Sequence, residues 1–74
     1  MKKILRTDNI AGLFTVDIEG RVSSARIGDL ISDDNGNLFK LTSVALSGSK
    51  LQSPILVLER INGTKPIGGY LDIE

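Results

Sequence analysis

The segment Asp33-Asp34-Asn35-Gly36-Asn37 places oxygen-bearing side chains at alternate positions, as a calcium-binding loop does around a hard cation. Counted from Asp33 as loop position 1, however, its glycine stands at position 4, one place after position 3, whereas a calcium loop needs it at position 6, one place after position 5. Val44 stands where the loop requires a bidentate glutamate. Because Asn-Gly between apolar strands is the strongest short hairpin signal, we expect a hairpin turn here and no metal site.

Catalytic chemistry finds few suitable residues in this chain. Histidine and cysteine are absent, so a serine nucleophile would need a lysine or a carboxylate as its base. No serine lies in the sharp-turn motif that exposes a nucleophile in hydrolases. Asn62-Gly63-Thr64 matches a glycosylation sequon and Gly68-Gly69 offers open backbone for a phosphate, but we interpret them as a turn and a flexible strand entry. We expect no enzymatic activity, no cofactor and no metal.

Basic residues on the expected strands form a candidate binding surface. They are Arg21, Arg26, Lys40 and Arg60. If they converge on one wall of a barrel, they would make the basic patch that nucleic-acid binding requires. Against this reading, nine Lys and Arg balance nine Asp and Glu, and one Tyr and two Phe leave little surface for base stacking. A solvated strand face of alternating charges is the competing interpretation.

The elements that would position these residues are all strands, because no window of ten residues shows helical periodicity. Ile10–Glu19 alternates as a half-buried strand, and a turn at Glu19-Gly20 should pair it with Arg21–Ile27. Further strands are expected at Lys3–Arg6, Leu30–Ser32, Leu38–Leu46, Ile55–Ile61 and Tyr70–Ile73. The polar segment Ser47–Pro54 is the longest expected loop.

This pattern predicts that residues 1–74 form one all-β domain, a single small barrel of about six or seven short antiparallel strands. Closure removes unpaired edges without a second sheet, although an open sandwich stays possible. No apolar run approaches the length needed to cross a bilayer. Arg6-Thr7-Asp8-Asn9 also interrupts any secretory signal, so we expect a cytoplasmic protein with no membrane partner.

Several short motifs resemble the second domain of translational GTPases over about residues 10–74. They are Gly20-Arg21-Val22, Ile27-Gly28-Asp29, the strand pair around Leu38–Leu46, Ile55–Ile61 and Pro66–Leu71. The resemblance implies a small β-barrel and, as an alternative function, contact with RNA or the ribosome through the four basic residues named above. The chain has no phosphate-binding Gly-x-x-x-x-Gly-Lys-Ser/Thr loop, so the resemblance does not extend to GTP hydrolysis.

Surplus apolar side chains favour a different function, a non-catalytic binding or assembly module that acts through a barrel face. The strand Ile55–Ile61 is apolar on both faces, with Leu56 and Leu58 on one of them. A barrel this small cannot bury both sets, so we expect Leu13, Leu56 and Leu58 to face a protein partner or a second copy. In the competing explanation, the N-terminal segment or Ser47–Pro54 covers these leucines and they belong to the core.

Overall fold

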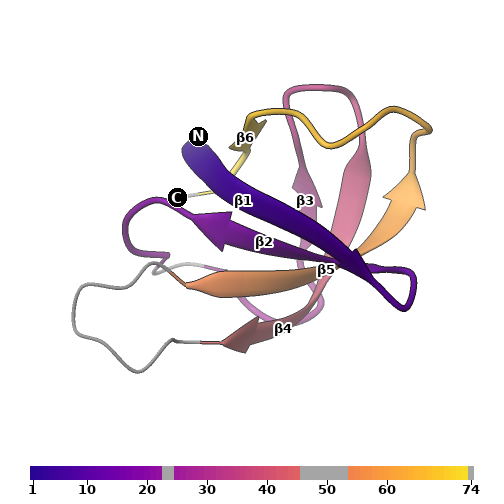
Figure 1. Cartoon of the computed structure of the whole chain (residues 1–74). Helices are drawn as coiled ribbons and strands as arrows, with labels where there is room; N and C mark the ends of the chain where they lie inside the picture. Colours follow the sequence, from indigo (N-terminus) through magenta and orange to yellow (C-terminus); the bar gives the residue numbers. More distant parts are fainter. Residues whose placement is uncertain (23–24, 46–53, 74) are drawn as a thin grey trace.

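The computed structural model describes residues 1–22, 25–45 and 54–73, which form a small, nearly closed antiparallel barrel (Figure 1). Its six strands are β1 Lys2–Ile10, β2 Leu13–Ile18, β3 Leu30–Ser32, β4 Leu38–Ala45, β5 Ile55–Asn62 and β6 Tyr70–Leu71. They neighbour one another in the order β3-β4-β5-β2-β1-β6. The predicted all-β small barrel is confirmed. In the described ranges no helix is long and apolar enough to span a membrane.

β1 and β2 form a hairpin closed by the pair Ile10 and Leu13. The turn residues Ala11 and Gly12 have φ angles of 53° and 82°, the left-handed values of a two-residue hairpin turn. The prediction of one continuous strand over Ile10–Glu19 is therefore wrong. The sequence did not indicate this turn, because alanine replaces the usual Asn or Asp at its first position. In addition, the exposed Ile10 falls at the same spacing of two as the apolar residues of β2, so the two strands looked like one.

The strand predicted over Arg21–Ile27 is also wrong, since none of its described residues lies in a strand. A turn forms instead, in which the Asp29 N–H donates to Arg26 O (3.0 Å) and the Arg26 N–H donates to Asp29 Oδ2 (2.9 Å). This turn attaches to β4, because the Gly28 N–H donates to Leu41 O and the Leu41 N–H donates to Asp29 O, both at 2.8 Å. The hairpin partner of β2 is accordingly β1.

The remaining predicted strands are found close to their expected positions. β3 and β4 pair as a hairpin around Asn35-Gly36, where the glycine has a φ of 86°. β5 lies between β4 and β2 as a central strand. β6 is shorter than the predicted Tyr70–Ile73, and most of the loop predicted over Ser47–Pro54 lies outside the described residues.

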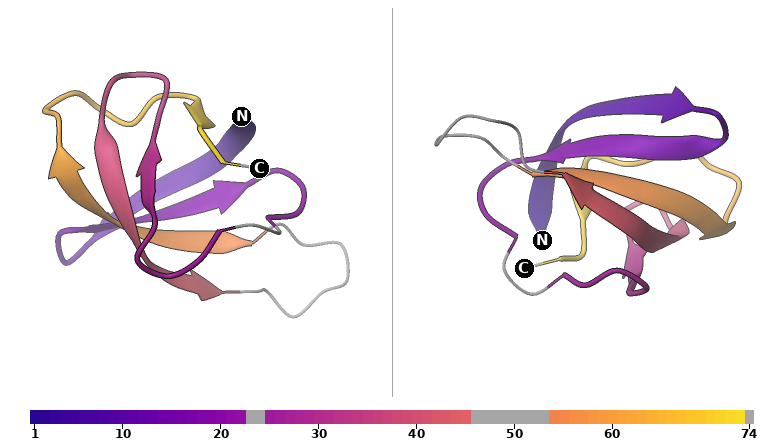
Figure 2. Two further views of the ribbon diagram at one scale, coloured as in Figure 1. Left: turned by 180° about the vertical axis from the view of Figure 1, so that it is seen from behind. Right: turned by 90° about the horizontal axis from the view of Figure 1, so that it is seen from below.

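The barrel closes where β3 meets β6, the two outer members of the sheet order (Figure 2). Asp33 and Leu71 form an isolated antiparallel bridge at this junction. Beside it, the Asp72 N–H donates to Ser32 O at 2.8 Å. The junction brings the β3–β4 turn against the segment that leads into β6.

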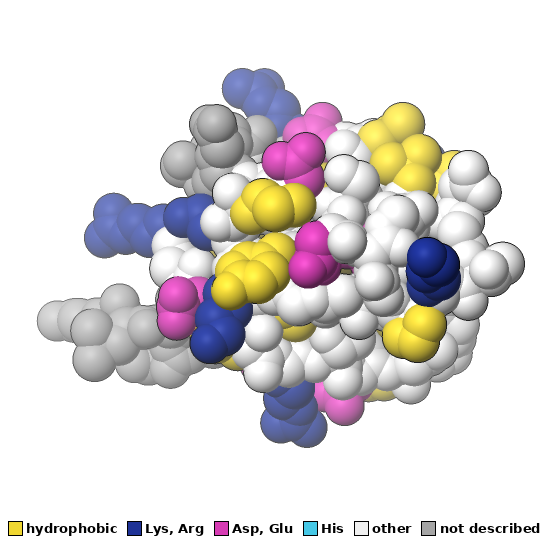
Figure 3. Space-filling view, turned by 90° about the horizontal axis from the view of Figure 1, so that it is seen from above, with side chains coloured by type: hydrophobic (Ala, Val, Ile, Leu, Met, Phe, Trp, Pro, Cys, Tyr) yellow, Lys and Arg dark blue, Asp and Glu magenta, His cyan; other side chains and the backbone are white. Residues whose placement is uncertain are grey.

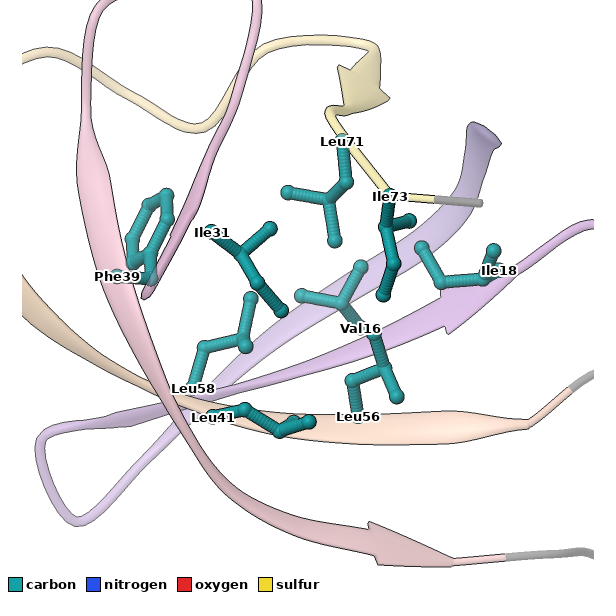
Figure 4. Packing of buried hydrophobic residues seen from close by; sticks show 9 residues of the cluster. All are labelled: Val16, Ile18, Ile31, Phe39, Leu41, Leu56, Leu58, Leu71 and Ile73. Carbon is teal, nitrogen blue, oxygen red and sulfur yellow. The ribbon is translucent and has the colours of Figure 1, made fainter. Parts of the chain in front are cut away.

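The barrel interior is filled by aliphatic side chains and one aromatic ring that point toward one another (Figure 4). The buried cluster consists of Val16, Ile18, Ile31, Phe39, Leu41, Leu56, Leu58, Leu71 and Ile73. Leu56 and Leu58 are 0% exposed, so the prediction that they line an exposed interface is wrong. Their backbone partners Val16 and Phe14 explain this, because directly paired residues of neighbouring strands share one face of the sheet.

Candidate functional site

A cluster of polar groups closes one end of the barrel, centred on Asp33 in the β3–β4 turn. This residue is only 6% exposed, and its carboxylate accepts four hydrogen bonds. Oδ1 accepts from the backbone N–H groups of Asn35 (3.0 Å) and Asn37 (2.8 Å). Oδ2 accepts from Asn37 Nδ2 (2.8 Å) and from the Gly68 N–H (3.0 Å). The aspartate thereby ties its own turn to the connector that precedes β6.

These hydrogen bonds also set the protonation state of Asp33. Burial alone would raise its pKa, but the side chain of Asn37 and the backbone N–H groups of Gly68, Asn37 and Asn35 outweigh burial and hold the pKa below its usual 3.8. A carboxylate offers about four lone-pair directions, and all are used here. Asp33 therefore acts as a structural group, and within the described residues no cluster of three or more acidic side chains could hold a metal ion.

Arg60, near the end of β5, extends the same cluster over the mouth of the barrel. Its Nη1 donates to Asn37 Oδ1 at 2.9 Å and to Lys65 O at 2.8 Å. Its guanidinium carbon lies 5.1 Å from the centre of the Phe14 ring and 5.8 Å from that of Phe39. Arg60 thus covers the aromatic end of the core and holds the connector after β5. Its positive charge interacts with the two aromatic rings and with the carbonyl of Lys65, so its role here is structural.

The four basic residues proposed as a binding surface do not share one face. Lys40 is exposed on the outer side of β4, opposite Glu59 of β5, whereas Arg60 turns inward over the aromatic rings. Arg21 and Arg26 are located in the segment between β2 and β3, and both are exposed. On the face shown in Figure 3, Lys and Arg side chains are scattered among acidic and hydrophobic ones.

Leu13 is half-buried on the outer face of the barrel, unlike Leu56 and Leu58, which are buried in the core. It pairs directly with Ile10, which is 60% exposed. Ile61 is 49% exposed and points away from the barrel mouth, in the direction opposite to its neighbour Arg60. The outer face therefore carries exposed apolar side chains near the β1–β2 hairpin.

In the part of the chain that the structure describes, the same hairpin presents a length of backbone with a free edge. β6 covers one side of β1 only at Lys2 and Lys3, followed by one hydrogen bond from the Ile4 N–H to Gly69 O (2.8 Å). From Leu5 to Ile10, the backbone pairing that the described residues provide is to β2 alone. In Figure 1 this part of β1 leads to the turn at the lower right that joins it to β2.

The ladder with β2 fixes which backbone groups face the free edge. A two-residue hairpin turn is closed by a hydrogen-bonded pair, here Ile10 and Leu13, and hydrogen-bonded pairs alternate with non-bonded ones along the ladder. Arg6 and Asp8 therefore bond to β2, while Thr7 and Asn9 direct their N–H and C=O groups outward. Both outward-facing residues are exposed.

Comparisons of the chain with protein-family models, with curated protein sequences and with solved structures gave no match. The resemblance to the second domain of translational GTPases stays a prediction.

Sequence reasoning missed both the Asp33 cluster and the free edge. An aspartate two residues before Asn35 is a local signal for a side-chain-to-backbone turn, but nothing in the sequence pairs it with Gly68. The edge was missed because Thr7-Asp8-Asn9 is continuously polar and lacks the alternation of apolar and polar residues that indicates a strand. Those residues are exposed on both faces, so burial imposes no period of two on them.

Proposed function

We propose that this chain is a non-catalytic binding module that takes up a strand of another polypeptide along the free edge of β1. The observation that carries the proposal is the stretch Leu5–Ile10, where Thr7 and Asn9 offer backbone donors and acceptors in the register of an antiparallel ladder. Strand addition to an open sheet edge takes its affinity from such main-chain hydrogen bonds.

The side chains around this edge suit a polypeptide partner. Leu5 and Ile10, at its two ends, are 53% and 60% exposed and offer apolar contact. Arg6 and Asp8 lie between them on one face and form an exposed ion pair of 3.1 Å, which offers charged contacts of both signs. An added strand would therefore meet a backbone ladder with apolar ends and a charged centre.

The alternative, an RNA-contacting barrel, has less support. The guanidinium of Arg60 is engaged with Asn37 and the connector after β5, and Lys40 lies on a different side of the strand pair. With a formal net charge of zero, no long-range field would gather phosphates. Binding of single-stranded or duplex RNA should accordingly be weak and should disappear at moderate salt.

A selection from a displayed library of extended peptides tests the proposal. Binders selected on the wild-type protein are then measured against Thr7→Pro, which removes one outward N–H without touching the ladder to β2. The matched control is Thr7→Val, which keeps the N–H and changes only the side chain. We expect binding to be lost in the proline variant and kept in the valine variant.

Asn9→Pro removes the neighbouring outward N–H and serves as the second variant if Thr7→Pro does not fold. Peptides that bind both proline variants as well as the wild type, or a library that yields no binder, would contradict the proposal.

A further inference from the structure

We infer that the strand taken up at this edge is β1 of a second copy, paired antiparallel about a twofold axis that passes through Thr7. The inference rests on the proposed function and names its partner. It follows from the backbone directions of β1 and from the order of charges along it.

The backbone directions restrict the possible axes. A twofold axis relates two antiparallel copies of a strand only under one condition. Each residue that directs its N–H and C=O groups toward the other copy must lie opposite a residue that does the same. Axes through Thr7 or Asn9 satisfy this with hydrogen-bonded central pairs, and an axis through Asp8 satisfies it with a non-bonded central pair.

The charges then select one axis. An axis through Asp8 places two aspartates directly opposite each other, which destabilises a strand pair. An axis through Asn9 places Arg6 beyond the partner's strand, next to its turn at Ala11 and Gly12. An axis through Thr7 instead sets Arg6 opposite Asp8 of the second copy, and it does so twice.

Pairing about the axis through Thr7 extends the ion pair between Arg6 and Asp8 that each chain already makes. Arg6 Nε lies 3.1 Å from Asp8 Oδ2 of its own chain, with the two side chains 71% and 48% exposed. In the paired state, each arginine would stand between two aspartates, and the four charges would alternate in sign around the axis. Thr7 would meet Thr7, a pair that suits neighbouring strands.

Features that usually protect a sheet edge limit the length of this pairing. The register between Ile4 and Arg6 shifts, so Leu5 forms a bulge, and bulges and charges both discourage edge-to-edge contact. The ladder that we propose therefore runs only from Leu5 to Asn9. A short ladder with two charge pairs predicts a reversible dimer.

Reversing the charges of Arg6 and Asp8 tests directly whether these residues face each other across the Thr7 axis. Sedimentation of the wild-type protein from roughly 1 µM to 1 mM should show a monomer that converts to a dimer. Arg6→Glu and Asp8→Lys should each weaken the dimer by about tenfold or more, because each turns two attractive pairs into repulsive ones. Mixing these two variants should restore the dimer, since both pairs of side chains that face each other across the axis are then of opposite charge.

Cross-linking locates the axis independently, because the native chain has no cysteine. Thr7→Cys places two thiols on the axis, where Cα atoms of a hydrogen-bonded pair lie about 5.5 Å apart, within reach of a disulfide. Asn9→Cys is the matched control, since its two copies would lie about four residues apart along the pair. We expect rapid dimer cross-linking from the first variant and slow cross-linking from the second.

The outcomes separate this inference from the function on which it rests. A wild-type protein that stays monomeric, a variant mixture that fails to restore the dimer, or faster cross-linking from Asn9→Cys would overturn the inference. If displayed peptides still bind in a manner that depends on the Thr7 N–H, the proposed function survives and the partner is a different polypeptide. Failure of both experiments refutes both.

Discussion

Asp33→Ala should destabilise this protein more than any other single substitution of a polar residue in the described ranges. The substitution removes the acceptor of four hydrogen bonds, two of them from the backbone N–H and the side-chain amide of Asn37, a residue that is only 1% exposed. It also releases Gly68 and therefore the connector to β6. The effect should appear as loss of global stability rather than as a local change in the turn.

The magnitude follows from these contacts. Hydrogen bonds to a charged group contribute about 1.5–3 kcal/mol each, and a buried donor left unpaired costs about 1–3 kcal/mol. Water can reach the N–H groups of Asn35 and Gly68, which are less buried, so we expect a net loss of about 3–5 kcal/mol. A domain of this size has a free energy of unfolding of about 4–11 kcal/mol, so the variant will be marginally folded.

Urea unfolding followed by far-ultraviolet circular dichroism measures this loss. The matched control is Asp34→Ala, because Asp34 is the exposed neighbour and its carboxylate accepts a hydrogen bond from the Tyr70 N–H at 3.1 Å. We expect the control to lose about 1 kcal/mol or less. Equal losses in the two variants, or a loss below about 1 kcal/mol for Asp33→Ala, would refute the view that this carboxylate closes the barrel.

Three further predictions use the same unfolding assay. Leu58→Ala should cost about 2–5 kcal/mol because the side chain is fully buried, whereas the half-exposed Ile61→Ala should cost less than about 1 kcal/mol; equal costs would place Leu58 outside the core. Gly63→Ala should cost more than Gly36→Ala, because both have positive φ but only a Cβ at residue 63 meets the β3–β4 turn; the reverse order would refute this packing. Finally, the depressed pKa of Asp33 contributes stability that is fully present above about pH 4 and is lost as the pH falls through the folded-state pKa. Asp33→Asn should flatten this decline of the unfolding free energy with falling pH. An unchanged pH profile would contradict the view that Asp33 causes the decline.

The sequence predicted the fold wherever a local signal and a burial pattern agreed. Asn35-Gly36 marks a hairpin turn by backbone chemistry alone, and the structure has its hairpin there. Ile55–Ile61 is apolar on both faces and too short for an ordinary helix, and β5 indeed lies between two other strands. The hairpin turn at Ala11-Gly12 was missed because alanine in a left-handed conformation leaves no such local signal.

The sequence could not decide which face of β5 lies inside. Ile55 and Val57 are as apolar as Leu56 and Leu58, so hydrophobicity alone ranks the two faces equally. The decision comes from the neighbouring strand, where Val16 pairs with Leu56 and has polar neighbours that must stay outside. Strand register is therefore the information that was missing, and it depends on contacts between residues far apart in the chain.

The free edge of β1 follows from the way in which the barrel closes. β6 stops pairing with β1 at Lys3 because the preceding connector is held elsewhere, with Gly68 bonded to Asp33 and Lys65 bonded to Arg60. A connector released from these contacts would be free to extend along β1 and cover its backbone. The polar cluster thus ties the end of the barrel together and, by the same hydrogen bonds, holds residues 65–68 away from the strand edge around Thr7, where we propose that a partner pairs.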